Sequence, residues 1–163
     1  MNKDLLYYYD YTTPIGLLTI GSIQNDIVFR QFEKYKGEGI YQENQCLKEA
    51  SQQLNEYFSK QRKVFDLHYR YLTGTPFQQK VWQTLLTIPY GQTASYQDIA
   101  YRIGSPKAYR AVGNANHHNP IVLFIPCHRV ITSSHYIGGY GGGIDKKEFL
   151  LHFEMGEEYD IKK

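Results

Sequence analysis

The chain has 163 residues and a formal net charge of +2, with 42% hydrophobic and 21% charged residues. This balance is typical of a folded globular protein rather than a disordered one, and the length suits one ordinary domain or two small ones. No apolar run approaches the roughly 18 to 20 residues of a membrane span, and the first residues lack the apolar core of a signal peptide. We therefore expect a cytoplasmic protein without a membrane partner, or a nuclear one if its source has a nucleus.

Charge is unevenly distributed along the chain. Residues 1–73 carry 9 basic and 9 acidic side chains, residues 74–144 carry 5 and 1, and residues 145–163 carry 4 and 6. A basic, acid-poor middle segment suits contact with a polyanion, although charge alone does not establish such a contact.

The chain has two cysteines, Cys46 and Cys127, and their settings do not suggest a disulfide pair. In a reducing compartment both are expected to remain thiols. There is no CxxC motif, and the histidines lack the spacing of metal ligands. We expect neither a metal site nor a cofactor.

The first seventy residues predict a small mixed unit of strands and one helix. LLTIGSI (17–23) and DIVFRQF (26–32) are strand-like and separated by a turn-prone segment, which predicts a hairpin. ENQCLKEASQQLNEYFSK (43–60) is rich in helix formers, whereas VFDLHYRYL (64–72) alternates apolar and polar residues like another strand. The aromatic run YYYDY is expected in a strand at the surface. TGTPF then interrupts the pattern and places a domain boundary near Gly74.

A helix is expected directly after this boundary. Thr75–Gln78 offers an N-cap threonine, a proline at the first helical position and a glutamine three residues after the cap. The apolar residues that follow share one helical face: Phe77, Val81, Trp82 and Leu85. The turn IPYG ends the helix.

Two short helices should follow. Ser95–Asp98 repeats the capping pattern, two isoleucines provide the buried face, and Gly104 ends the helix. Ser105–Pro106 is expected to begin the next helix at once, through KAYRAVGNA (107–115). Two short helices joined by a Gly-Ser-Pro turn are typical of a helix-turn-helix.

The second of these helices combines small residues with one long cation. Ala108, Ala111 and Gly113 surround Arg110 on the side that we expect to face outward. Two interpretations stay open: close packing in a core with Arg110 at the surface, or an approach to the DNA minor groove with the arginine among the bases.

Cys127 lies in IVLFIPCHRV (121–130), where an apolar run predicts a buried strand that ends at the cysteine. A cysteine in this setting is often a small buried hydrophobe. Three neighbours favour a reactive thiolate instead: Pro126 argues against a continuing strand, His128 could take the proton directly or through water, and Arg129 adds positive charge.

A glycine-rich loop follows the cysteine. Five glycines between residues 138 and 143 surround Tyr140, and a loop with so little side-chain bulk can wrap a flat ring closely. The capping pattern Asp145–Glu148 predicts a further helix that ends near Gly156. Glu154 could orient a histidine in triad-like fashion, or it could be an ordinary solvated carboxylate.

These segments resemble the O6-alkylguanine-DNA alkyltransferases, also called methylated-DNA–protein-cysteine methyltransferases. PCHRV is similar to the active-site motif of that family. TPFQQKVWQTLLTIPYGQTASYQDIA, SPKAYRAVGNANHHNPIVLFIPCHRVI and GGYGGGIDKKEFLLHFE resemble the family in the same order, over residues 75–154. The first seventy residues fit the family only in size and strand content.

The resemblance implies an α+β fold. Residues 1–73 should form a ribonuclease-H-like mixed sheet with a helix, which we expect to be structural because the spaced carboxylates of a metal-dependent nuclease are missing there. Residues 74–163 should form a mainly helical, winged-helix-like domain with the helix-turn-helix.

The resemblance also implies a function, which is direct repair of double-stranded DNA by a monomer. The alkyl group of O6-alkylguanine, with O4-alkylthymine as a second candidate substrate, would move irreversibly to Cys127. The helix-turn-helix would enter the minor groove, the damaged nucleotide would rotate out, and Arg110 would fill its place. A poorly paired base costs less to extrude than a normal one. The stable thioether product limits each molecule to one reaction.

Catalytic roles follow from the same resemblance. Cys127 would be the nucleophile and His128 its base through a water, with Glu154 behind the histidine. Asn119 would help hold this network.

The base-binding roles are likewise implied. Tyr96 would donate a proton to the leaving guanine, supported by Lys147, while main-chain groups of Cys127 and Val130 would contact the guanine edge. The pocket set is Val130, Tyr140, Gly141 and Gly142. The DNA-contact set is Arg110, Tyr96, Gln97, Ser105, Ala108, Gly113 and Ser133.

One position departs from relatives that carry a serine after the pocket tyrosine. Gly141 removes that hydroxyl donor, although its backbone amide remains, and the glycine-rich wall should accept alkyl groups larger than methyl. Three other functions are alternatives to alkyl transfer: an alkyltransferase-like lesion binder without chemistry, a cysteine hydrolase, and a plain DNA-binding module. The first lacks the reactive cysteine that is present here, and the second would assemble its pair from distant segments.

Overall fold

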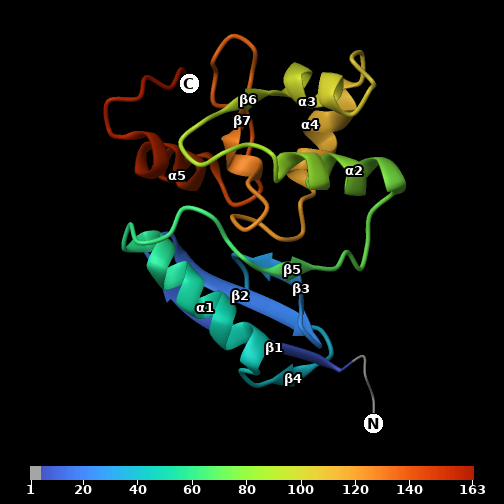
Figure 1. The fold of residues 1–163 in the computed structure, drawn as a ribbon, viewed down its shortest axis with the longest axis vertical. Helices are drawn as coiled ribbons and strands as arrows, with labels where there is room; N and C mark the ends of the chain where they lie inside the picture. Colours follow the sequence, from blue (N-terminus) through green and yellow to red (C-terminus); the bar gives the residue numbers. More distant parts are fainter. Residues whose placement is uncertain (1–4) are drawn as a thin grey trace. The chain divides into compact units, whose positions relative to one another are not determined.

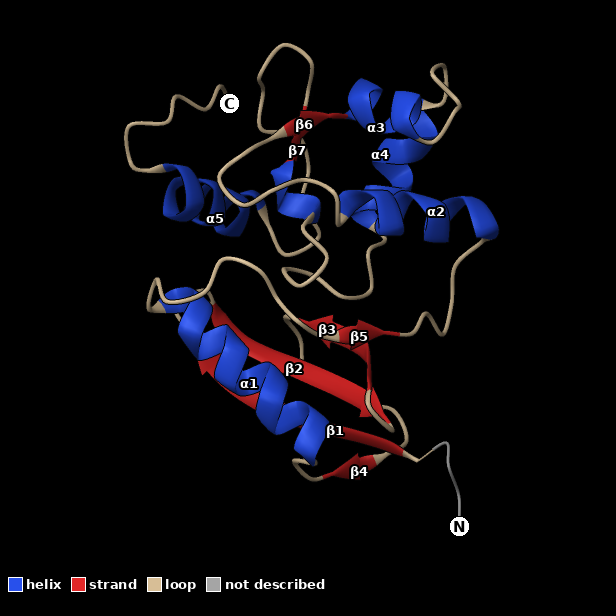
Figure 2. Ribbon diagram, in the orientation of Figure 1, coloured by secondary structure: helices blue, strands red, loops and turns tan. Residues whose placement is uncertain are grey.

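The computed structural model describes residues 5–163, and the chain divides into two compact units, one ending at Leu72 and the other spanning Thr73–Lys163. The first unit is a five-stranded sheet with one helix, and the second is mainly helical with a two-stranded sheet (Figure 2). The expected α+β class is therefore confirmed. Within the described residues, no helix has both the length and the apolarity that crossing a membrane would require.

The sheet of the first unit is mixed, with strand order β4-β1-β2-β3-β5. Its antiparallel centre consists of β1 (Leu6–Thr13), β2 (Gly16–Ile23) and β3 (Asp26–Gln31), which confirms the predicted hairpin. β4 (Ile40–Tyr41) and β5 (His68–Tyr69) join its two edges as short parallel strands.

Helix α1 (Gln45–Phe58) lies along one face of this sheet (Figure 1). Asn44 begins it, because its side chain accepts a hydrogen bond from the backbone N–H of Leu47. Leu47 and Leu54 are buried on the helix, together with Cys46. Burial is the main reason that the pKa of the Cys46 thiol is raised to about 11, so this cysteine stays protonated at neutral pH.

The expected strand over 64–72 is wrong in length. Only His68–Tyr69 pairs, in parallel with the start of β3. Beyond this pair, the backbone N–H of Arg70 still donates to the Ile27 carbonyl. The Arg70 side chain forms an ion pair with Asp26 at 2.9 Å, and this side-chain contact takes the place of further strand pairing.

Helices α2 (Pro76–Leu85) and α3 (Tyr96–Arg102) begin as the sequence predicts. Each has a reciprocal capping box, Thr75 with Gln78 and Ser95 with Asp98, in which side chain and backbone exchange hydrogen bonds. Gly104, with φ +79°, follows the end of α3.

Two predicted helix starts are wrong by a few residues. Helix α4 (Tyr109–His117) does not begin at Ser105, because residues 105–108 form a turn closed by the Ala108 N–H and the Ser105 carbonyl. Helix α5 (Ile144–Met155) is preceded by Gly143 at φ +105° and makes no side-chain cap. Asp145 therefore lies inside the first turn, where its charge favours the positive end of the helix dipole.

The predicted strand before the cysteine is also wrong. Residues 121–125 are buried but form a turn, in which Leu123 has φ +69° and the Ile125 N–H donates to the Ile121 carbonyl. Cys127–Arg129 follows as one turn of 3-10 helix, η1, and β7 (Val130–Ile131) then pairs in parallel with β6 (Ala94–Ser95).

Gly74, at the entry to α2, provides a test of packing in the second unit. It has φ +100°, and a Cβ built on it would lie 2.5 Å from Cη2 of Trp82, the single tryptophan of the chain. Gly104 has φ +79° but nothing within 4 Å of such a Cβ. Gly104→Ala therefore carries backbone strain of about 1 kcal/mol, whereas Gly74→Ala adds a clash of about 1–3 kcal/mol. Urea denaturation should rank the two variants in that order, with a changed tryptophan emission for Gly74→Ala alone, and equal losses would contradict the clash.

Candidate active site

Cys127 opens the 3-10 turn η1 and is almost completely enclosed, with 2% of its surface exposed. Its backbone N–H donates to the Ile125 carbonyl at 2.8 Å, which holds it against the turn that precedes it. Pro126 separates the two turns. The thiol is therefore carried by a tight, buried turn and not by the end of a strand.

The neighbouring His128 is part of a buried charge network. Its Nε2 lies 2.9 Å from Oε2 of Glu154, which belongs to α5. Arg129 binds the same carboxylate with two nitrogens, Nε to Oε1 at 2.8 Å and Nη2 to Oε2 at 3.0 Å. Its third nitrogen donates to the Ile88 carbonyl at 2.7 Å, so the guanidinium is fixed on both sides.

This network defines the protonation of its members. Burial would raise the pKa of the Glu154 carboxyl, but the charges and hydrogen bonds of His128 and Arg129 outweigh it and hold that pKa well below its usual range. Burial also lowers the pKa of His128, assisted by Arg129 and Lys147 and opposed by Glu154. The imidazole is therefore neutral at pH 7. Its single ring proton lies on Nε2, which donates to the Glu154 carboxylate. Nδ1 is left as a free base, without a hydrogen-bond partner among the described residues.

Lys147 is a second buried charged group close to the cysteine. It lies on α5, is fully buried, and donates from Nζ to the carbonyls of Val130 at 2.6 Å and Gly139 at 3.1 Å. Burial lowers the pKa of Lys147 to about 8, an effect partly opposed by Cys127. The lysine thus ties the strand after the cysteine to the glycine-rich loop, and in its charged form it favours a thiolate at Cys127.

Tyr96, the first residue of α3, faces the glycine-rich loop. Burial raises the pKa of its hydroxyl, and a backbone hydrogen bond at Gly139 offsets this only in part, so the phenol keeps its proton at neutral pH. A Cβ at Gly138 would lie 2.6 Å from the Tyr96 hydroxyl oxygen, and Gly138 has φ +71°. A glycine is therefore required for the loop to approach the tyrosine this closely.

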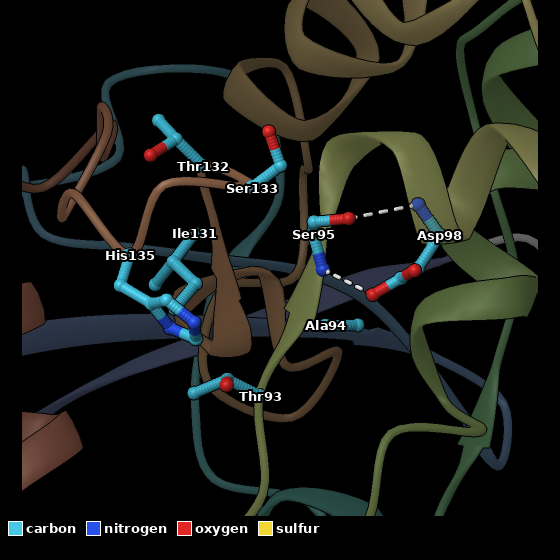
Figure 3. Close-up of a pocket in the computed structure, with 8 residues that line it drawn as sticks. All are labelled: Thr93, Ala94, Ser95, Asp98, Ile131, Thr132, Ser133 and His135. Carbon is cyan, nitrogen blue, oxygen red and sulfur yellow. Dashed lines mark hydrogen bonds between the residues drawn. The ribbon is translucent and has the colours of Figure 1, made fainter.

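A pocket of about 290 Å³ lies beside Tyr96. It is lined by Tyr96, Gln97, Tyr109, Gly113, Thr132 and Ser133. A pocket of about 280 Å³ shares Thr132 and Ser133 with it and extends to Thr93 and His135 (Figure 3). In Figure 3 the hydrogen bonds of the Ser95–Asp98 capping box form one wall, and His135 lies across from them.

The structure brings most of the predicted catalytic residues together. His128 and Glu154 meet, and His128 directly follows Cys127 in the chain; the alternative of a solvated Glu154 is wrong, since it is 8% exposed and doubly ion-paired. Asn119 is close but has different partners: it donates to the Ile125 carbonyl and accepts from the Ile121 N–H. It holds the turn before the cysteine.

The predicted pocket and DNA-contact residues are more dispersed. Four of the DNA-contact set line one pocket: Tyr96, Gln97, Gly113 and Ser133. Arg110 and Ser105 are exposed at the helix-turn-helix, and Ala108 is half-buried there. In the glycine-rich loop Tyr140 is buried, Gly142 is half-buried and Gly141 is exposed.

Two features of the site were not predicted from the sequence. Arg129 was expected to act on the thiol by its charge, but its partner is Glu154, which lies 25 residues away in the chain and gives no local signal. Asn116 was not predicted as a site residue, although its side chain donates a hydrogen bond to the backbone carbonyl of Cys127. Its position one helical turn after the apolar Val112 is a signal that could have identified a buried polar residue.

Comparison with known proteins gives matches along nearly the whole chain. The family model for the 6-O-methylguanine DNA methyltransferase ribonuclease-like domain matches residues 6–71, and that for the DNA binding domain of the same protein matches residues 76–156. A constitutive methylated-DNA--protein-cysteine methyltransferase of Bacillus subtilis is 46% identical over 158 residues, covering 91% of this chain and 94% of the relative.

Mycobacterial proteins are similarly close. A methylated-DNA--protein-cysteine methyltransferase of Mycobacterium tuberculosis is 45% identical over 156 residues, covering 92% of this chain and 93% of its own. The crystal structure of Mycobacterium tuberculosis OGT in complex with DNA superposes with a TM-score of 0.85 at 43% identity, covering 91% of this chain and 92% of that one.

The buried Lys147 predicts an unusual dependence of stability on pH. Its pKa is about 8 in the folded chain against an ordinary 10.5, so between these values the unfolded chain holds the extra proton. Stability then rises with pH across this window, and the cost of burying the charge is fully present below it. The free energy of unfolding of wild type, relative to Lys147→Met, should increase by about 2 kcal/mol from pH 7 to pH 9.5. The adjacent, half-buried Lys146 supplies the control Lys146→Met, and a difference that does not change with pH would contradict the prediction.

Proposed function

The chain belongs to the 6-O-methylguanine DNA methyltransferase family, as its resemblance predicted, and we propose that it repairs DNA by transferring the alkyl group of O6-alkylguanine to its own Cys127. The observation that carries this proposal is the buried sequence Cys127-His128, in which the imidazole is oriented by Glu154 and leaves Nδ1 as a base. A thiolate is the nucleophilic form of cysteine, and a neutral imidazole beside it supplies the means of ionisation.

The chemistry balances with the groups at the site. The thiol proton passes through a water to His128 Nδ1, and the thiolate attacks the alkyl carbon. The bond between that carbon and guanine O6 breaks, and its electron pair stays with the purine. Tyr96, still protonated at neutral pH, donates a proton to the leaving base and regains one from the His128 imidazolium through water, while Lys147 holds the backbone beside it. A thioether remains on sulfur, so each molecule reacts once.

DNA binding is assigned to the helix-turn-helix of α3 and α4. Exposed Arg110 and Ala111 suit a minor-groove approach in which the arginine takes the place of an extruded nucleotide. Double-stranded DNA is thus the proposed partner of a cytoplasmic monomer, with O4-alkylthymine as a further candidate substrate. Residues 74–163 would bind DNA and react, while residues 1–73 would be structural.

The DNA contacts and the pocket extend this proposal. Gln97, Ser105, Ala108, Gly113 and Ser133 complete the DNA-contact set, and Val130, Tyr140, Gly141 and Gly142 surround the base. A Cβ at Gly141 would lie 3.4 Å from the His117 carbonyl oxygen, so a serine fits there, and glycine leaves that space for alkyl groups larger than methyl.

Intact-mass measurement after mixing with duplex DNA that carries O6-methylguanine tests the reaction. Wild type should gain one methyl group per chain and no more with excess DNA, since the thioether cannot be hydrolysed by the groups at the site. Cys127→Ser should gain none, whereas Cys46→Ser should behave as wild type because that thiol is buried and stays protonated. A methylated Cys127→Ser chain, or an unmodified wild type that is properly folded, would exclude the proposal.

Arg110 should matter for extrusion and not for chemistry. Arg110→Ala is expected to slow single-turnover methyl transfer from duplex DNA by about tenfold or more, which is part of the few kcal/mol that unstacking a base costs, and to change the rate on single-stranded DNA far less. Lys107→Ala removes a nearby exposed cation and serves as the control for simple charge loss. Equal slowing of Arg110→Ala on duplex and single-stranded DNA would assign the arginine to ordinary phosphate binding.

A further inference from the structure

Asn116 is a buried polar residue in the last turn of α4, with 4% of its surface exposed. Its Nδ2 donates to the backbone carbonyl of Cys127 at 3.3 Å. Its Oδ1 is buried and has no hydrogen-bond partner among the described residues. An apolar side chain at this position would avoid that cost, which is about 1–3 kcal/mol for a buried unpaired group, so the asparagine calls for a specific reason.

A second unpaired acceptor belongs to the residue that directly follows the same cysteine. His128 Nδ1 is buried and also lacks a partner among the described residues. It is an acceptor because the ring proton lies on Nε2, against Glu154. Two acceptors cannot bind each other, but a single water can donate one hydrogen to each and still present a lone pair to a third group.

We propose that Asn116 is a positioning residue that, together with His128 Nδ1, holds one water with its lone pair toward the thiol of Cys127. This rests on the proposed function, because the water is the one through which the thiol loses its proton. In the transfer step the S–H proton moves to the water oxygen and a water proton moves to Nδ1. A thiolate and an imidazolium paired with Glu154 result, and the water is regenerated.

The ionisable groups around this water are already held by other partners. Glu154 and Lys147 come from α5, Arg129 from η1 and Tyr96 from α3, and each has its own hydrogen bonds or backbone contacts. A neutral amide can orient the water without adding charge beside the thiolate. Asn119 does not substitute for it, because both ends of its side chain bind the backbone of the preceding turn.

The test is the pH dependence of single-turnover methyl transfer from DNA carrying O6-methylguanine, for wild type, Asn116→Leu and Asn114→Leu. Asn114 is exposed on the same helix and provides the matched control. At pH 7 Asn116→Leu should react about tenfold more slowly, and the difference should close at higher pH, where the thiol ionises without the relay. The rate profile is thus displaced to higher pH by about one unit, whereas Asn114→Leu follows wild type.

A merely structural role would lower the rate of Asn116→Leu by the same factor at every pH, and that parallel profile, or an unchanged one, overturns the inference. Trp82 reports on folding, because its Nε1 donates to the carbonyl of Ala115, the residue before Asn116. If the emission of Asn116→Leu is altered, Asn116→Ser keeps a small acceptor and should show a smaller displacement in the same direction; a parallel profile for it would also overturn the inference. If the wild-type protein gains no methyl group, the proposed function itself is excluded.

Discussion

The site depends on one carboxylate that is shared between an imidazole and a guanidinium. Glu154 sits in a buried position where a lone charge would be strongly unfavourable, and Arg129 compensates by binding both of its oxygens. Because arginine keeps its charge at all accessible pH values, the carboxylate stays ionised whether or not His128 carries a second proton. The carboxylate in turn selects the tautomer of His128. The imidazole next to Cys127 therefore owes its orientation to Glu154, which Arg129 in turn holds in place.

Buried polar side chains also hold the backbone of the reactive turn. Asn119 binds the turn before Cys127, Asn116 binds its carbonyl, and Lys147 binds the carbonyl of Val130 just after it. Over residues 121–129, side-chain hydrogen bonds thus take the place of regular strand pairing, which begins again at Val130. Such a segment can be fully buried and yet carry Cys127 in a tight turn.

Local patterns in the sequence were sufficient for some elements and insufficient for others. The capping boxes at Thr75 and Ser95 were predicted because all their partners lie within four residues. A similar pattern at Asp145 predicted a capping box that is not formed. The helix begins one residue earlier, at Ile144, directly after the glycine-rich loop. The strand expected at 121–126 failed because an apolar run signals burial but not backbone shape, which is imposed there by Asn119.

The same distinction applies to the site. The cysteine, its histidine and the tyrosine of α3 were predicted as site residues from motifs, and the glutamate from its place near the end of the last helix. The partners of Arg129 and Asn119, and the contact of Asn116 with Cys127, were not predicted. Each depends on contacts between segments that only the folded chain brings together. Resemblance locates residues, but hydrogen-bond partners must be found in the three-dimensional structure.

The two-residue pairing of β6 with β7 has a mechanical consequence. Ser95, which caps α3, is in register with Ile131, and Ala94 is in register with Val130, three residues after Cys127. Backbone hydrogen bonds thereby connect the helix-turn-helix to the reactive turn, and a slip of one residue would displace one against the other by about 3.3 Å. The separation between the start of α3 and the turn that carries Cys127 is therefore fixed by main-chain hydrogen bonds, and substitutions among the side chains that line the pockets would leave that separation unchanged.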